Sequence, residues 1–110
     1  MLTIQRSASY RIITRAVNLD AQPLVALLAP GAEDCELCSD LQQLQAGLDA
    51  CPESIVVYNQ QAEARALVDQ LRLPASQVFI EIRQDTRGVL GLHALRRGDA
   101  GVDTLELIYQ

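Results

Sequence analysis

Two cysteines in a Cys-X-X-Cys arrangement, Cys35 and Cys38, are the residues of this sequence best suited to chemistry. The thiolate form of cysteine is a nucleophile, and two thiols at positions i and i+3 of a helix lie on the same face. On the first turn of a helix, such a pair can close a disulfide with little backbone movement. The spacing therefore predicts reversible dithiol–disulfide chemistry, in which Cys35 attacks a substrate disulfide and Cys38 resolves the mixed disulfide.

A leucine stripe predicts the helix that would position this pair. Its members recur at i, i+4, i+7 and i+11 and favour a helix from about residue 34 or 35 to residue 50: Leu37, Leu41, Leu44 and Leu48. At the first turn, Cys35 would lie near free backbone N–H groups and the positive end of the helix dipole, which favour the thiolate. Cys38 would flank the stripe, so we expect Cys35 to be the more exposed sulfur.

The charges around the motif oppose this effect. Four carboxylates crowd the pair: Glu33, Asp34, Glu36 and Asp40. Negative charge disfavours thiolate formation, although solvent screens exposed carboxylates. We therefore expect only a modest lowering of the pKa of Cys35, which is typical of a reducing catalyst more than of a strong oxidant.

Cys51 and the single histidine, His93, are the other residues that could bind zinc through sulfur or imidazole. A four-ligand site within one chain would need both of them together with Cys35 and Cys38. Cys51 would lie roughly 20 Å from the pair along the same helix, which leaves only a cluster shared between chains. We therefore predict no metal and no cofactor. Cys51 is interpreted as a small buried apolar residue, and His93 as a surface or hydrogen-bonded side chain.

Charge and length exclude several classes of function. The chain has 110 residues, a formal net charge of −5, nine arginines and no lysine. A negative protein attracts neither nucleic acid nor anionic lipid, and the absence of lysine excludes Schiff-base chemistry. No apolar run is long enough for a membrane span, and we expect one cytoplasmic domain over residues 1–110. Between Arg15 and Arg65 there are eight acids and no base, which favours contact with a basic partner.

The hydrophobic pattern predicts an α/β fold with the element order βαβαβαββα. The expected strands are residues 2–5, 24–29, 55–58, 78–83 and 89–92, and the expected helices are residues 7–17, 34–50, 59–71 and 99–109. We expect parallel βαβ crossovers followed by an antiparallel pair, in a mixed sheet with helices on both faces. Residues 84–88 are predicted to form the turn between the last two strands.

The element order and the placement of the motif together resemble the thioredoxin-like superfamily over nearly the whole chain. The most similar members we can name are glutaredoxin-like domains of the protein disulfide oxidoreductase type and the N-terminal domain of the alkyl hydroperoxide reductase flavoprotein. The resemblance is carried by residues 24–29 followed by Cys35-Glu36-Leu37-Cys38, by Leu71-Arg72-Leu73-Pro74-Ala75 before a strand, and by residues 88–92 before the last helix.

This resemblance implies a three-layer sandwich and a substrate site. In the superfamily, the proline before the fourth strand is cis and faces the motif. Carried over, Leu73–Pro74 would be cis, and the backbone of Leu73 and Ala75 would pair with an extended substrate beside the disulfide.

Two functions follow from the resemblance. The first is a thiol–disulfide oxidoreductase that uses Cys35 and Cys38 on a protein or small-molecule disulfide. The alternative is a non-catalytic thioredoxin-like adaptor or assembly chaperone, which would bind a protein with a basic surface through its own acidic surface.

Overall fold

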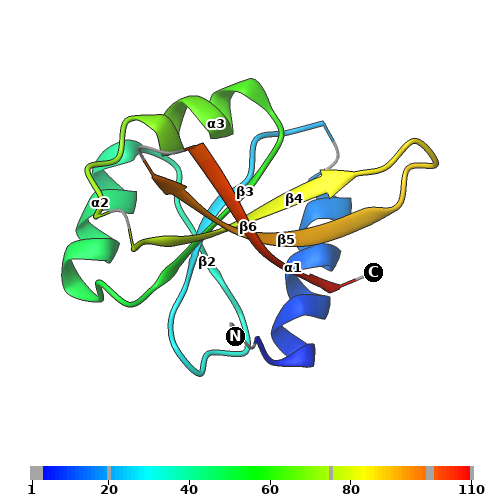
Figure 1. Cartoon of the computed structure of the whole chain (residues 1–110), viewed down its shortest axis with the longest axis horizontal. Helices are drawn as coiled ribbons and strands as arrows, with labels where there is room; N and C mark the ends of the chain where they lie inside the picture. The colour runs from blue at the N-terminus through cyan, green and yellow to red at the C-terminus, as the bar shows by residue number, and fades with distance from the viewer. Residues whose placement is uncertain (1–3, 20, 75, 99–100, 110) are drawn as a thin grey trace.

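The computed structural model describes residues 4–19, 21–74, 76–98 and 101–109, and their side chains as far as residue 96. These residues form three helices and six strands (Figure 1). In chain order they are α1 (Arg6–Asn18), β1 (Val25–Leu28), β2 (Glu36–Leu37), α2 (Leu41–Ala50), β3 (Ile55–Asn59), α3 (Ala62–Asp69), β4 (Val78–Gln84), β5 (Leu90–Gly98) and β6 (Gly101–Tyr109).

The six strands form one mixed sheet in the order β2-β1-β3-β4-β5-β6. Among the strands of the described residues, only β3 and β4 are parallel, and α3 connects them as a crossover. The other neighbouring pairs are antiparallel. The prediction of an α/β fold with a mixed sheet is therefore confirmed, with one parallel crossover instead of a series.

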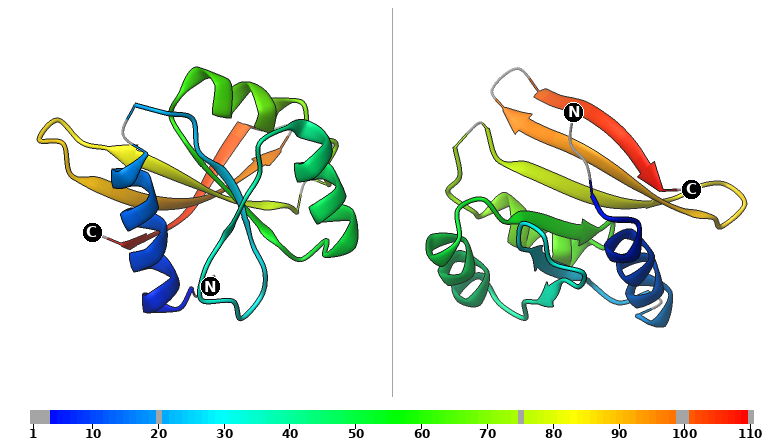
Figure 2. Two further views of the ribbon diagram at one scale, coloured as in Figure 1. Left: turned by 180° about the vertical axis from the view of Figure 1, so that it is seen from behind. Right: turned by 90° about the horizontal axis from the view of Figure 1, so that it is seen from below.

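Helices cover both faces of the sheet, as expected, and each face has its own core (Figure 2). On one face, Ala8 and Ile12 of α1 pack against alternate residues of the central strands, such as Val57 and Ile80. On the other face, α2 and α3 contribute Leu44, Leu48, Ala64 and Val68. We call these the α1 face and the α2/α3 face.

The helix predicted from residue 34 or 35 is wrong at its start, because α2 begins at Leu41. Asp40 is the N-cap, and its carboxylate accepts a hydrogen bond from the backbone N–H of Gln43 at 2.7 Å. Residues 36–37 are instead extended and pair with β1 as β2. Leu37, the first member of the predicted stripe, is 40% exposed. Pairing with the edge of β1 and the N-cap at Asp40 together favour an extended Leu37, although its spacing fits the helical stripe.

The predicted parallel relation between the strands at 24–29 and 55–58 is also wrong, since β1 and β3 are antiparallel. Strand β2 is the physical reason. It runs antiparallel to β1 and returns the chain to the end of the sheet where β1 begins. Helix α2 then crosses to the far end, and β3 must run back against β1.

The helix predicted at 99–109 is wrong as well, because Gly101–Tyr109 is strand β6. Strand β5 continues to Gly98, beyond the predicted end at residue 92, and leaves a row of backbone donors and acceptors that β6 pairs with. Of the strand predicted at 2–5, residues 2 and 3 lie outside the described residues, and Ile4 and Gln5 precede α1 without forming a strand. No helix among the described residues is long and apolar enough to cross a membrane.

Candidate functional site

The two cysteines of the motif lie on opposite faces of the sheet. Cys35 is buried in the core of the α1 face, whereas Cys38 is half-buried against the α2/α3 core. The segment that joins them contains β2, and an extended chain separates Cα atoms three residues apart by about 10 Å. A disulfide needs a Cα separation of about 4.4–6.8 Å. All three cysteines are free, and the expected placement of the pair on one helical turn is wrong.

Electrostatics keep both thiols of the motif protonated near neutral pH. Burial raises the pKa of Cys35, and the positive charge of Arg15 only partly offsets this effect. Burial also raises the pKa of Cys38, and the carboxylates of Glu36 and Asp40 raise it further. Neither thiol lies in the first turn of a helix, where the dipole would favour thiolate. The expected modest acidification of Cys35 is therefore wrong.

One of the four acids near the motif is neutralised by a base from α1. The Arg15 guanidinium donates to both carboxylate oxygens of Asp34, at 3.1 and 2.8 Å. Asp34 also accepts the backbone N–H of Cys35 at 2.9 Å. The hydrogen bond from Arg15 holds the pKa of Asp34 below its ordinary value. This pair attaches the segment around Cys35 to α1, and it removes one charge from the predicted acidic surface.

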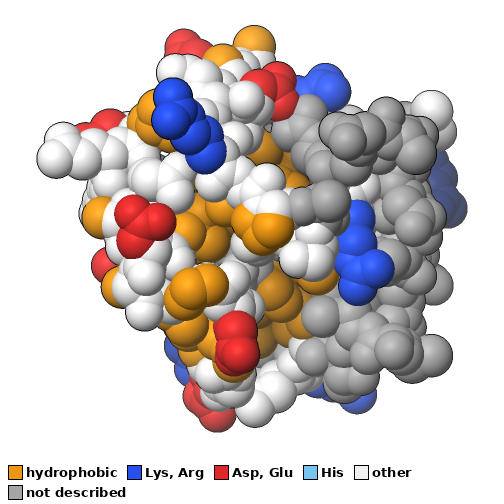
Figure 3. Space-filling model, turned by 60° about the vertical axis from the view of Figure 1, so that its left-hand side comes forward, with side chains coloured by type: hydrophobic (Ala, Val, Ile, Leu, Met, Phe, Trp, Pro, Cys, Tyr) orange, Lys and Arg blue, Asp and Glu red, His pale blue; other side chains and the backbone are white. Residues whose placement is uncertain are grey.

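The predicted substrate residues lie away from the cysteines. No peptide bond between described residues is cis, so the predicted cis bond Leu73–Pro74 is wrong, and Ala75 lies outside the described residues. Leu73 and Pro74 line a hollow of about 250 Å³ on the α2/α3 face, before β4 begins. Cys38 lies at the other end of the sheet, where its N–H donates to Val25 O. Figure 3 shows apolar side chains gathered on the side of the molecule that carries α2 and the segment before β4.

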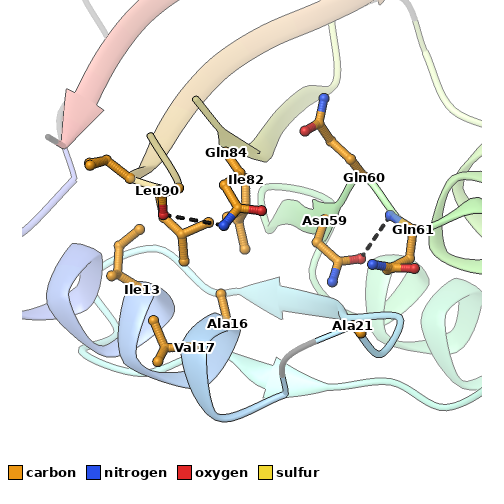
Figure 4. Close-up of a pocket in the computed structure, with 12 residues that line it drawn as sticks. Ile13, Ala16, Val17, Ala21, Asn59, Gln60, Gln61, Ile82, Gln84 and Leu90 are labelled. Atoms are coloured by element: carbon orange, nitrogen blue, oxygen red, sulfur yellow. Dashed lines mark hydrogen bonds between the residues drawn. The ribbon is translucent and has the colours of Figure 1, made fainter. Parts of the chain in front are cut away.

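A larger cleft of about 700 Å³ opens on the α1 face (Figure 4). It lies between α1 and the turn that joins β4 to β5, at the carboxyl ends of the parallel strands β3 and β4. Ligands of open α/β sheets commonly bind at this edge. The residues that line it are Ile13, Ala16, Val17, Ala21, Asn59, Gln60, Gln61, Ile82, Gln84, Gly88, Val89 and Leu90.

Among the residues that the structure describes, none that lines this cleft is charged, although charged residues make up 21% of the chain. Ile13 and Val17 form one wall from α1, and Leu90 of β5 lies across from Ile13 (Figure 4). Val89, the residue before Leu90, also lines the cleft. Ile82 is buried at the base. The lining combines apolar side chains with the carboxamides of one asparagine and three glutamines, and the volume falls within the roughly 300–1,000 Å³ that is typical of small-molecule sites.

The carboxamides of the cleft differ in what they already bind. Asn59 is a structural residue: its Oδ1 accepts from the backbone N–H of Leu24 at 3.1 Å, and its Nδ2 donates to Gln22 O at 2.7 Å. Gln84 donates one N–H to Gly88 O at 3.2 Å. Figure 4 shows the Gln84 carboxamide in the middle of the cleft, whereas that of Gln60 points away from α1.

Sequence reasoning missed a row of polar side chains across the α2/α3 face. Tyr58 donates its hydroxyl to Glu81 at 2.7 Å, and Arg83 Nε donates to the other Glu81 oxygen at 2.7 Å. His93 pairs with Glu81 in the register of β4 and β5. The alternation of residues 78–83 could have placed Arg83 beside Glu81, but the position of His93 depends on the hairpin register.

The polar row has a defined protonation pattern. Although burial opposes it, the bonds from Tyr58 and Arg83 lower the pKa of Glu81. Burial lowers the pKa of His93, and Arg83 lowers it further, so the imidazole is neutral at pH 7. No group of three or more potential metal ligands occurs in the described part of the chain. The row therefore stabilises a buried carboxylate and offers no metal site.

Comparisons with protein-family models, curated proteins and solved structures find no match for this chain. The likeness to the thioredoxin-like superfamily therefore stays a prediction.

Proposed function

We propose that this domain is a ligand-binding module and that its ligand, an uncharged and partly apolar small molecule, occupies the cleft between α1 and the β4–β5 turn. The observation that carries this proposal is the cleft of about 700 Å³ whose described lining residues are all uncharged, in a chain with a net charge of −5. A charged ligand would lose its hydration there without gaining a counter-charge. An uncharged ligand loses little and buries apolar surface.

This proposal shares only its non-catalytic character with the adaptor or assembly chaperone predicted from the sequence. It replaces a basic protein bound at the acidic surface with a small molecule bound in the cleft. Thiol–disulfide exchange and a thioredoxin-like fold stay predictions. The distance between Cys35 and Cys38 across the sheet gives the exchange reaction no support, because resolution requires the second thiol beside the first. The trans bond before Pro74 and the strand at 101–109 differ from what the resemblance implied.

Binding of the uncharged dye Nile red tests the proposal. Val17 lines the cleft and is 59% exposed, so Val17→Arg adds a charge at the wall without opening the core. Asn18→Arg adds the same charge one residue further along α1, outside the lining. We expect dye affinity at least tenfold weaker in Val17→Arg than in the wild type and Asn18→Arg, measured by fluorescence titration. Equal affinity of all three proteins would contradict the proposal.

A further inference from the structure

We infer that Gln84 recognises the adenine ring of an uncharged nucleoside through a pair of hydrogen bonds. This inference rests on the proposed function, because it names the ligand of the same cleft. It is carried by the way the β4–β5 turn holds Gln84 and by the groups that remain available on its carboxamide.

The turn fixes the carbonyl oxygen that Gln84 contacts. Asp85 accepts three backbone N–H groups of the turn: its carboxylate accepts those of Arg87 at 2.8 Å and Val89 at 2.9 Å, and its carbonyl accepts that of Gly88 at 3.0 Å. Gly88 has a φ of 85°, which other residues rarely adopt, and a Cβ there would stand 3.4 Å from Gln84 Nε2. The Gln84 carboxamide is therefore oriented before any ligand binds, which reduces the entropy that binding would cost.

The bond to Gly88 uses one of the two N–H donors of the Gln84 carboxamide. Among the described residues, the Gln84 carbonyl oxygen and its second N–H have no hydrogen-bond partner. A primary amide in this state presents a donor and an acceptor side by side. The adenine N6–H donor and N7 acceptor are complementary to that edge, and glutamine binds adenine in this bidentate way.

The rest of the cleft favours a ligand with a flat, uncharged ring. Ile13 and Val17 on one side and Leu90 on the other offer apolar contacts to the two faces of a ring. The volume of about 700 Å³ leaves room for a sugar beside the base. Since no arginine is found among the described residues of the lining, a phosphate would gain no counter-charge from them, and we expect a nucleoside to bind at least as tightly as its nucleotide.

Chemical-shift titration of the ¹⁵N-labelled protein with adenosine and N6,N6-dimethyladenosine tests this inference, because methylation removes the N6–H donor and keeps the ring. In the wild type we expect about tenfold weaker binding of the dimethyl compound, within the range for loss of a bidentate contact. Gln84→Leu should weaken adenosine binding by a similar factor and abolish the difference. Gln70→Leu is the matched control, because Gln70 also donates Nε2 to a backbone carbonyl, that of Ala66, but lies outside the cleft.

Two further ligands, nicotinamide and AMP, test the choice of adenine and the choice of an uncharged ligand. Nicotinamide carries a similar donor–acceptor edge on a carboxamide, and tighter binding of nicotinamide than of adenosine would overturn the choice of adenine. Tighter binding of AMP than of adenosine would overturn the choice of an uncharged ligand.

The outcomes distinguish this inference from the proposed function. If adenosine and its dimethyl derivative bind the wild type equally, or if Gln84→Leu changes neither, the inference fails. Nile red binding that depends on Val17 would then still support the ligand-binding cleft. If neither the dye nor any nucleoside binds, both proposals fail.

Discussion

Cys35 combines the properties of a structural thiol. It is 5% exposed, it packs with residues of α1 and the central strands, and its backbone N–H is held by Asp34. Asp34 also accepts hydrogen bonds from the Arg15 guanidinium, so Arg15 attaches the segment around Cys35 to α1. A buried thiol with a raised pKa reacts slowly, because the thiolate is the reactive form.

Alkylation kinetics give the prediction at this scale. At pH 7.5, iodoacetamide should modify Cys35 at least about tenfold more slowly in the folded protein than in urea, because burial raises its pKa and blocks access. Peptide mapping by mass spectrometry follows Cys35 and Cys38 separately. After mild oxidation with diamide, we expect both thiols to remain in the monomer. Their joint loss without dimer formation would instead support the disulfide predicted from the sequence.

The contact between α2 and the sheet depends on one residue without a side chain. Gly47 lies in α2 over β1, and a Cβ at this position would overlap Leu27 Cδ1. Leu27 is buried in the α2/α3 core, so it has little room to move. The glycine therefore sets how closely α2 approaches β1.

Gly47→Ala tests this packing. Alanine gains about 1 kcal/mol of helix propensity, but overpacking a core costs about 1–3 kcal/mol, so we expect a net loss of about 1 kcal/mol in the free energy of unfolding. Leu27→Val in the same chain should recover part of that loss. Ala46→Gly, at the exposed neighbouring position, measures the propensity effect alone. Urea denaturation checks all four proteins, and a more stable Gly47→Ala would refute the close contact.

The elements with strong periodicity were predictable from the sequence. The expected segments at 7–17, 55–58, 59–71 and 78–83 match α1, β3, α3 and β4 to within a few residues, and the turn at 84–88 is confirmed. Each of these segments buries one face or is apolar throughout. The spacing of its apolar residues therefore indicates directly whether it packs as a helix or as a strand. Ile13 and Val17 of the cleft could therefore be assigned to a helix.

The remaining elements depend on partners distant in the sequence. Leu37 fits a helical stripe, yet its backbone pairs with Ala26. The apolar residues in 101–109 recur at helical spacing, yet this segment pairs with the long edge of β5 as a strand. The cleft was not predictable either, because Gln84 reaches it only through the β4–β5 turn. Local periodicity does not record such pairings.

At the scale of the whole molecule, the polar row crosses three neighbouring strands within one apolar face. Tyr58, Glu81 and His93 belong to β3, β4 and β5 and lie in register. Protonation of Glu81 or His93 therefore changes the charge of a row that spans these three strands.

Acid should destabilise the protein in two stages. The folded-state pKa of His93 is below its ordinary value of 6.5, so the unfolded chain gains a proton first, and stability falls as the pH drops below about 6.5. The folded-state pKa of Glu81 is lowered from its ordinary value of 4.5. Glu81 therefore confers stability that is present above pH 4.5 and is lost as the pH falls through its folded-state pKa. The folded-state pKa values of Asp34 and Asp85 are lowered from 3.8, so these two residues add to the second stage.

Urea denaturation between pH 7.5 and 3 measures both stages. His93→Gln should remove the first decline and keep the second, because glutamine does not titrate. A wild type whose free energy of unfolding is the same at pH 7.5 and pH 5 would contradict the role assigned to His93.

The two-residue strand β2 also bears on self-association of the chain. Strand β1 is a buried apolar run, and its outer edge would otherwise offer free backbone groups to a strand from another copy. Strand β2 covers that edge and itself provides only a short template, with an exposed glutamate at position 36. A chain in which residues 36–37 could not pair, for example with proline in place of Leu37, would present β1 to its neighbours and form intermolecular sheets at high concentration.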